Sequence, residues 1–243
     1  QLVVTGESIS DMTRSVSYET DPSSIVSVSK AGHVTPLANG SVKVTAKTAE
    51  GLSAQIELTV EQFEIPQPIN FPNEIVPLFT KHGCNGGGCH GKSEGQNGFK
   101  LSLLGFEPTE DFEYLVKEVR GRRVFPAAPQ HSLLLRKGAG DLPHGGGARF
   151  EHDSWDYRAI VRWIEQGMPY GSPDDPKLES IAVYPSSRIV VPGAEQQLAV
   201  TAFYTDGSVR DVTGIVSYES NQKEMGEVNK SGLVTMLKDQ TGD

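Results

Sequence analysis

The two cysteines of this chain stand close together, and a histidine directly follows the second. The segment Cys84–His90 reads C-N-G-G-G-C-H, and the other 241 positions hold no cysteine. Two thiols can form thioethers with the vinyl groups of a haem, and an adjacent imidazole can bind its iron, as in the pattern C-x-x-C-H. Here the spacing is C-x4-C-H, two residues longer. The segment therefore predicts covalent haem attachment if the extra residues can loop out.

Glycine between the cysteines makes such a loop feasible. Asn85 is followed by three glycines, which adopt positive-φ conformations without the steric penalty of a Cβ. A haem would then be held by both thiols, with His90 as the proximal ligand. The alternative is a disulfide between Cys84 and Cys89 that closes a small loop and leaves His90 without a role. The spacing alone leaves both interpretations open.

Two further kinds of site are disfavoured by their context. Residues 86–93 match the phosphate-binding pattern G-x-x-x-x-G-K-S, but that loop needs a buried strand before it and a helix after it. Neither 81–85 nor 94–98 has the corresponding pattern, so we expect no nucleotide. Two cysteines and scattered histidines also lack the paired ligand spacing of a closed zinc site.

Helices must hold this motif in place. A helix over 74–81 leads directly into Cys84, although Pro77 makes it brief or irregular. A second helix is expected over 110–119. The third has the clearest pattern, because Asp153 or Ser154 can cap it and Gly167 can end it. Its apolar stripe is formed by Tyr157, Ile160, Val161 and Ile164, with Trp163 beside it.

The two ends of the chain repeat each other at a shift of 200 residues. Residues 11–19 match 211–219, and 29–35 match 229–235 without a gap. Such self-similarity indicates one folding unit used twice. Polar and apolar residues alternate along several short stretches, which predicts the strands of antiparallel β-sandwiches. These stretches are 24–29, 41–46, 55–60 and 197–202.

Both copies resemble bacterial Ig-like domains of group 2. They share D-x-T-x-x-V-x-Y and K-x-G-x-V-T, and the first copy adds G-S-V-K-V-T-A. Neither copy is complete, because 181–185 has no counterpart in the first and 41–60 has none in the second. Exposed strand edges would follow, and self-association through these edges is one expectation. A chain cut inside the repeat and mutual complementation of the two copies both remain open.

The region between the copies resembles the cytochrome c domains of planctomycete-type cell-surface proteins, which lie among such Ig-like repeats. Four motifs occur in the order of that family, G-C-N-x-G-x-C-H-G, G-F-K-L-S-L-x-G, P-H-G-G-G-x-R and W-I-x-x-G-x-P, at residues 83–91, 98–105, 143–149 and 163–169. The resemblance implies a mainly α, class I cytochrome c-like fold with one covalent haem c. We therefore expect a multidomain chain with Ig-like segments at 1–63 and 177–243 around a haem domain at 66–176.

The same resemblance indicates a second axial ligand. His144 precedes the last helix, where class I cytochromes place their distal ligand, and the glycines after it would allow close approach to a haem. Met168 is the alternative ligand, and an open sixth position is the third possibility. Arginine side chains suit the haem propionates because a guanidinium matches a carboxylate. The candidates are Arg122, Arg123 and Arg149, and the expected pocket lining is Phe99, Leu101, Leu103, Leu104, Phe106, Leu133, Leu134 and Trp163.

Composition limits the function classes that remain. The formal net charge of −9 gives no electrostatic footprint for nucleic-acid binding, and the apolar runs are too short to span a bilayer. We expect part of a mature extracytoplasmic protein, since covalent haem and disulfides both belong to that compartment. The favoured function is electron transfer to an unknown redox partner. The alternatives are a haem enzyme or gas sensor with an open axial site, and a haem-free adhesion or scaffold protein.

Overall fold

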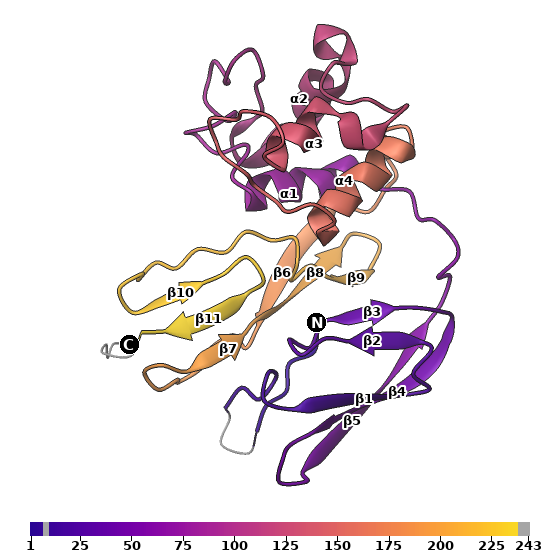
Figure 1. The fold of residues 1–243 in the computed structure, drawn as a ribbon, viewed down its shortest axis with the longest axis vertical. Helices are drawn as coiled ribbons and strands as arrows, with labels where there is room; N and C mark the ends of the chain where they lie inside the picture. The colour runs from indigo at the N-terminus through magenta and orange to yellow at the C-terminus, as the bar shows by residue number, and fades with distance from the viewer. Residues whose placement is uncertain (7–9, 238–243) are drawn as a thin grey trace.

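Small antiparallel β-sheets lie at both ends of the chain, and the helices lie between them in sequence (Figure 1). The computed structural model describes residues 1–6 and 10–237, with the backbone alone at 119 and 120. The end of the predicted last segment, 238–243, falls outside this part. Within the described residues, no helix has the length and apolarity needed to cross a bilayer.

The first β segment contains two sheets. Strands β1 (Ser17–Asp21), β4 (Gly40–Lys47) and β5 (Ser53–Val60) pair in the order β1-β4-β5, while β2 (Val26–Val28) pairs with β3 (Val34–Pro36). The alternation predicted for 41–46 and 55–60 is therefore confirmed as strands, and that for 24–29 yields a shorter one. Apolar residues of 24–29 and 41–46 form a core of Val26, Val42 and Val44, whereas Ile56 in 55–60 is exposed.

The second β segment also contains two sheets. Strands β6 (Leu178–Tyr184), β8 (Ala199–Tyr204) and β9 (Val209–Asp211) form one sheet; β7 (Glu195–Gln197), β10 (Gly226–Val228) and β11 (Leu233–Met236) form the other. Among the described strands, only the β10–β11 pair has a counterpart in the first segment, the β2–β3 pair. The predicted strand over 197–202 is divided between β7 and β8, because the chain changes sheets here: β7 pairs with β11, and β8 pairs with β6 and β9. The edge strand β6 exposes all its residues.

The internal repeat is visible in the hydrogen bonds. The Tyr18 hydroxyl donates to the Thr13 carbonyl at 2.9 Å, and the Tyr218 hydroxyl donates to the Thr213 carbonyl at the same distance. Each threonine hydroxyl in turn accepts a backbone N–H, from Val4 in the first copy and Val200 in the second. The tyrosine–threonine pairs, which are 200 positions apart, therefore make the same hydrogen bond, as the sequence repeat predicts.

The middle region folds as short helices connected by long loops. Helix α1 (Val76–Lys81) continues the π-helical turn η1 (Phe71–Ile75), and α4 (Trp155–Glu165) is the longest helix. The predicted helix over 110–119 is confirmed as a broken run, α2 (Pro108–Phe112), η3 (Glu113–Lys117) and η4 (Glu118–Gly121). Three elements were not expected, namely η2 (Leu103–Gly105), η5 (Pro129–His131) and α3 (Leu133–Gly138).

Local chemistry explains where these helices begin and end. Pro77 lies in the first turn of α1, where the missing N–H costs nothing, so that helix continues to Lys81. The Ser154 hydroxyl accepts the Tyr157 N–H at 3.2 Å and caps α4, and Gly167 follows its end at φ +83°. The apolar face of α4 packs on η1 and α1 and completes the core around Phe71.

Candidate functional site

The cysteine motif forms a closed loop at the end of α1. The Cys84 N–H donates to the Phe79 carbonyl at 2.7 Å, and the His90 N–H donates to the Cys84 carbonyl at 3.0 Å. A Cβ at Gly91 would collide with the Asn85 carbonyl, so the loop can close only with glycine there. The expectation that the glycines at 86–88 adopt positive φ is wrong, because hydrogen bonds within the turn and the close approach at Gly91 close the loop without it. Both cysteines and His90 line one cavity.

This cavity has a volume of about 680 Å³, within the usual range of small-molecule and cofactor sites. Its wall is formed by three sections of the middle region: the cysteine loop, the segment 96–101 with α3, and the glycine-rich segment 143–149. Apolar and aromatic side chains predominate inside it. They are Phe79, Phe99, Leu101, Leu133, Leu134 and Phe150.

Two imidazoles from opposite parts of the sequence meet at the cavity. The ring centroids of His90 and His144 are 6.1 Å apart and their planes differ by 8°. Two metal–imidazole bonds of roughly 2 Å each, with the inner halves of both rings, span about 6 Å. The centroid separation is thus close to that of two imidazoles on one metal ion.

Backbone carbonyls fix the tautomer of both rings. His90 Nδ1 lies 2.9 Å from the Phe99 oxygen, and His144 Nδ1 lies 3.0 Å from the Gly147 oxygen. Because a carbonyl only accepts, each Nδ1 carries the proton and donates it. Each Nε2 is left with a lone pair, which is the arrangement of imidazole ligands oriented by a carbonyl partner.

Burial sets the protonation state of the motif. Desolvation lowers the pKa of His90. The hydrogen bond to Phe99 raises this pKa, but the charges of His144, Arg123 and Lys137 lower it further, so the net shift is downward. The ring is therefore neutral at physiological pH and able to bind a metal. Burial also raises the pKa of Cys84 to about 11, so its sulfur is a thiol and not a thiolate at neutral pH. Both cysteines are free thiols in the structure, without a disulfide between them.

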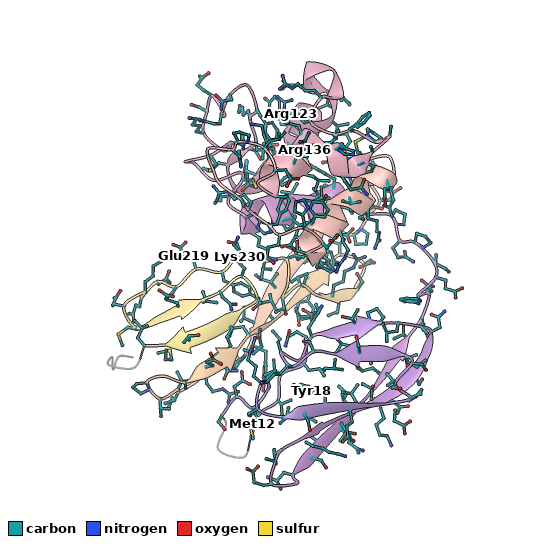
Figure 2. The ribbon with its side chains drawn as sticks, in the orientation of Figure 1. Met12, Tyr18, Arg123, Arg136, Glu219 and Lys230 are labelled. Atoms are coloured by element: carbon teal, nitrogen blue, oxygen red, sulfur yellow. The ribbon has the colours of Figure 1, made fainter. Side chains whose placement is uncertain are left out.

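The predicted arginines have different roles. Arg123, labelled among the helices in Figure 2, is buried and lines the cavity, but its guanidinium donates to the Tyr114 and Gly98 carbonyls. It also stacks on the Phe99 ring, 4.6 Å from the centroid, so its main role is to hold the pocket wall. Arg149 donates from Nη2 to Cys89 Sγ at 3.5 Å and lies beside the motif.

Several predicted lining residues lie elsewhere. Trp163 is fully buried in the core, where its indole N–H donates to the Pro169 carbonyl at 2.9 Å, because it occupies the centre of the α4 face. Met168, the alternative axial ligand, follows α4 at φ +59° and packs against that same core. Neither residue lines the cavity, and neither do three mostly exposed side chains, Leu103, Leu104 and Phe106.

Sequence reasoning missed two contributors to the wall. Lys137, on α3, adds a cation beside the rings, and the Phe150 ring packs on Gly138 so closely that a Cβ there would collide with it. Both depend on α3, and the run Leu133–Leu135 that begins this helix has no helical periodicity. The available signal was Lys137, two positions after the end of that run.

The His and Cys side chains at the cavity do not form a complete set of ligands for a metal ion. Across residues 1–6 and 10–237, no three His, Cys, Asp or Glu side chains are grouped so as to hold a metal ion by themselves. The cavity offers two imidazoles and two free thiols, together with several apolar side chains. The described side chains therefore leave most ligand positions of a metal ion unfilled.

Comparisons with known proteins reach only part of the chain. No family model matches it. A 58-residue stretch is 40% identical to Ice-binding protein 1 of Shewanella frigidimarina, and 59 residues are 42% identical to Lacto-N-biosidase of Bifidobacterium bifidum. These matches span 24% of this chain but only 6% and 5% of those proteins. Among solved structures, surface layer protein SbsC, domains 1-6, covers 100% of this chain and 20% of its own at 14% identity and a TM-score of 0.24. The chain is therefore related over a short stretch to large bacterial proteins, and no family is established for the whole.

Proposed function

We propose that the middle region binds one haem c and transfers electrons. The observation that carries this proposal is the pairing of His90 and His144, with parallel rings 6.1 Å apart and both Nδ1 atoms bonded to backbone carbonyls. A bound haem would supply reversible one-electron chemistry at its iron, and the protein supplies burial and axial ligands. No protein acid–base pair is needed for that role.

The cysteines suit covalent attachment. Each S–H adds across one vinyl C=C bond, with sulfur bonded to one carbon and hydrogen to the other, so the addition consumes no oxidant or reductant. Cys84 is protonated at neutral pH and lines the cavity with Cys89. Arg149 and Lys137 place positive charge at the wall, where the carboxylates of a propionate would be neutralised.

Covalent binding is tested by the colour of the protein. Protein made together with a cytochrome maturation system should be red and keep its haem through acid–organic extraction. Replacing both Cys84 and Cys89 by alanine should give haem that washes out, because no thioether can form. Colourless wild-type protein, or wild-type haem that extracts completely, would disprove the covalent proposal.

The axial ligands are tested with carbon monoxide. A reduced iron that binds His90 and His144 has no open position and should resist CO, whereas His144→Ala should bind it. The exposed His131 provides a matched control, since His131→Ala should leave the spectrum unchanged. Wild-type protein that binds CO rapidly would support the alternative of an open-site enzyme or sensor. An unchanged His144→Ala spectrum would exclude His144 as a ligand.

Location and partners form part of the same proposal. Covalent haem attachment implies an extracytoplasmic protein at the cell envelope, where a redox partner would exchange electrons with the site. Self-association is proposed through the unpaired edges of β5 and β6, since each ends its sheet among the described strands. Neither nucleic acid nor nucleotide enters this function. Sedimentation at increasing protein concentration tests self-association, and a concentration-independent monomer would remove it.

A haem-free surface scaffold is the second candidate. The short matches to Ice-binding protein 1 and Lacto-N-biosidase favour it, because they offer no cytochrome, and the β segments would then be the functional part. The site would in that case be a structural cavity beside two unmodified thiols. The extraction experiment separates the two candidates, since only a cytochrome retains haem.

A further inference from the structure

A buried ionic junction lies behind the site. Asp156 Oδ2, on α4, accepts Lys81 Nζ at 2.7 Å and His82 Nε2 at 2.6 Å. The side chains of all three residues are at most 10% exposed. Burial would raise the pKa of Asp156, but the hydrogen bonds from His82 and Lys81 outweigh it and hold that pKa below its ordinary value. The end of α1, just before the cysteine loop, is therefore tied to α4.

The second β segment also enters this junction. Lys81 Nζ donates to the Gly214 carbonyl at 2.6 Å, and Ile215 packs against the core of the middle region. Lys230 reaches from the turn between β10 and β11, and its ammonium lies 3.2 Å from His82 Nδ1 and 3.4 Å from the Arg149 carbonyl. Figure 2 shows Lys230 on the side of that segment nearest the helices.

These contacts lead directly to the site. Lys230 joins His82, two residues before Cys84, to Arg149, five residues after His144. Arg149 returns to the same place, because its Nη1 donates to the His82 carbonyl at 3.4 Å while Nη2 donates to Cys89 Sγ. One lysine of the β segment thus connects the cysteine-bearing and the His144-bearing sections of the wall.

The first copy of the repeat lacks these contacts with the middle region. Lys30 and Ser15 occupy the positions of Lys230 and Ile215. Ser15 is exposed where Ile215 is half-buried, whereas both lysines are exposed and differ only in the partners within reach. The lysine belongs to the shared K-x-G-x-V-T motif in both copies. The second copy, which packs on the middle region, therefore uses the shared lysine, Lys230, for contacts with His82 and Arg149 that Lys30 does not make.

We propose that the second β segment is part of the framework of the site and that Lys230 is a positioning residue, which holds the sections bearing Cys84 and His144 at a fixed separation. This inference rests on the proposed haem function for its effect on ligation. Its effect on the protein without haem does not depend on that function, because every contact named above belongs to the polypeptide.

The test uses the full chain with three variants. Lys230→Met removes the ammonium and keeps the length of the side chain, Lys230→Arg restores a cation, and Lys30→Met is the matched control. In haem-free protein, amide hydrogen exchange over 82–91 and 144–150 should become about threefold faster in Lys230→Met, the size expected for a partly exposed charged contact. Lys230→Arg should recover most of the protection, and Lys30→Met should match wild type.

In haem-loaded protein, the fraction of reduced haem that binds CO should rise about threefold in Lys230→Met, because the same contact holds His144 in place. Unchanged exchange in Lys230→Met would overturn the inference even if haem is bound. Faster exchange without any change in CO binding would limit Lys230 to domain docking and overturn the positioning role. If wild-type protein takes up no haem, the proposed function fails, and the exchange experiment alone decides whether Lys230 holds the two sections.

Discussion

The two copies of the repeat share their internal contacts and differ in their surroundings. In both, a threonine two residues after an aspartate accepts a backbone N–H through its hydroxyl and accepts a tyrosine hydroxyl through its carbonyl. Among the residues that the structure describes, it is the second copy that packs against the helical core, through Ile215, and receives Lys81 at the Gly214 carbonyl. The repeat therefore specifies the β fold, and the residues that vary between copies specify the docking.

The largest effect is expected from breaking the docking junction. Asp156→Asn removes the charge that stabilises Lys81 and His82, and should lower the free energy of unfolding by about 3 kcal/mol, as for a broken buried ion pair. The same stabilisation is present above the ordinary carboxyl pKa and should be lost as the pH falls towards the lowered pKa of Asp156. Urea unfolding followed by tryptophan fluorescence measures the loss of stability in the variant and the loss of stability of the wild type at low pH.

The exposed pair of Glu19 and Lys47 in the first copy is the control for this variant. Glu19→Gln removes a surface contact and should cost less than about 0.5 kcal/mol. Equal losses in Glu19→Gln and Asp156→Asn would show that the junction does not stabilise the docked copy.

The next effect concerns a glycine that both copies need. Gly32 and Gly232 have φ of +75° and +77°, and an added Cβ would lie 2.7 Å from the Leu2 carbonyl in one and 2.8 Å from the Tyr218 hydroxyl in the other. Alanine should cost about 2 kcal/mol at each position, from the left-handed conformation and the close contact together. Gly32→Ala should cost more, because a backbone oxygen yields less than a tyrosine hydroxyl.

Gly207 separates the two causes, since its φ is +79° but an added Cβ would have no neighbour within 4 Å. Gly207→Ala should therefore cost only the conformational part, about 1 kcal/mol. Chemical unfolding of the three alanine variants gives the comparison. A Gly207→Ala loss as large as that of Gly32→Ala would remove the close contact from the explanation.

A smaller and equal effect is expected at the paired tyrosines. Tyr18→Phe and Tyr218→Phe each remove one hydrogen bond to a threonine carbonyl and should each cost about 1 kcal/mol. Matching losses would sharpen the equivalence of the copies. A loss confined to Tyr218→Phe would mean that docking, and not the repeat, determines the strength of this bond.

The smallest effect is expected in alkaline solution. Burial, followed by the charge of Asp211, raises the pKa of Tyr218 to about 12, and burial with Asp11 raises that of Tyr18. Since the unfolded tyrosine ionises near pH 10, stability should be intact below that pH and fall as the pH rises towards 12. The loss should be a fraction of the roughly 1.4 kcal/mol that one pKa unit represents, because both rings are only half-buried.

Unfolding at a series of alkaline pH values tests this dependence. Tyr218→Phe should flatten the decline between pH 10 and 12, and Tyr18→Phe should flatten it less. A decline that persists unchanged in both variants would assign it to other groups.

Local patterns predicted the parts of the fold that are themselves local. Alternation located β4 and β5, and the cap and stop signals at Ser154 and Gly167 located α4. The repeat showed that one β unit occurs twice. The loop in the cysteine motif was predicted from the wrong glycines: residues 86–88 do not adopt positive φ, and closure instead requires Gly91, which follows the insert.

Long-range contacts explain what could not be predicted. The pairing of Lys81 with Asp156 joins residues 75 positions apart, and neither position has a periodic signal. Periodicity also does not distinguish a core position from a pocket position, so Trp163 was placed in the wrong one. Arg123 was expected to face a ligand, but carbonyls on two separate segments take up its guanidinium. Such choices depend on which backbone acceptors tertiary folding brings near a side chain.

The carbonyls that hold His90 and His144 have a consequence for how sequence change would affect the site. Both acceptors belong to the main chain, so a substitution at Phe99 keeps the acceptor atom as long as the loop keeps its path, whereas Gly147, at φ +70°, tolerates replacement less well. The orientation of the two imidazole rings should therefore change little when side chains in these loops are substituted, and more when residues are inserted or deleted. Mutational robustness at this site should follow loop length more closely than residue identity.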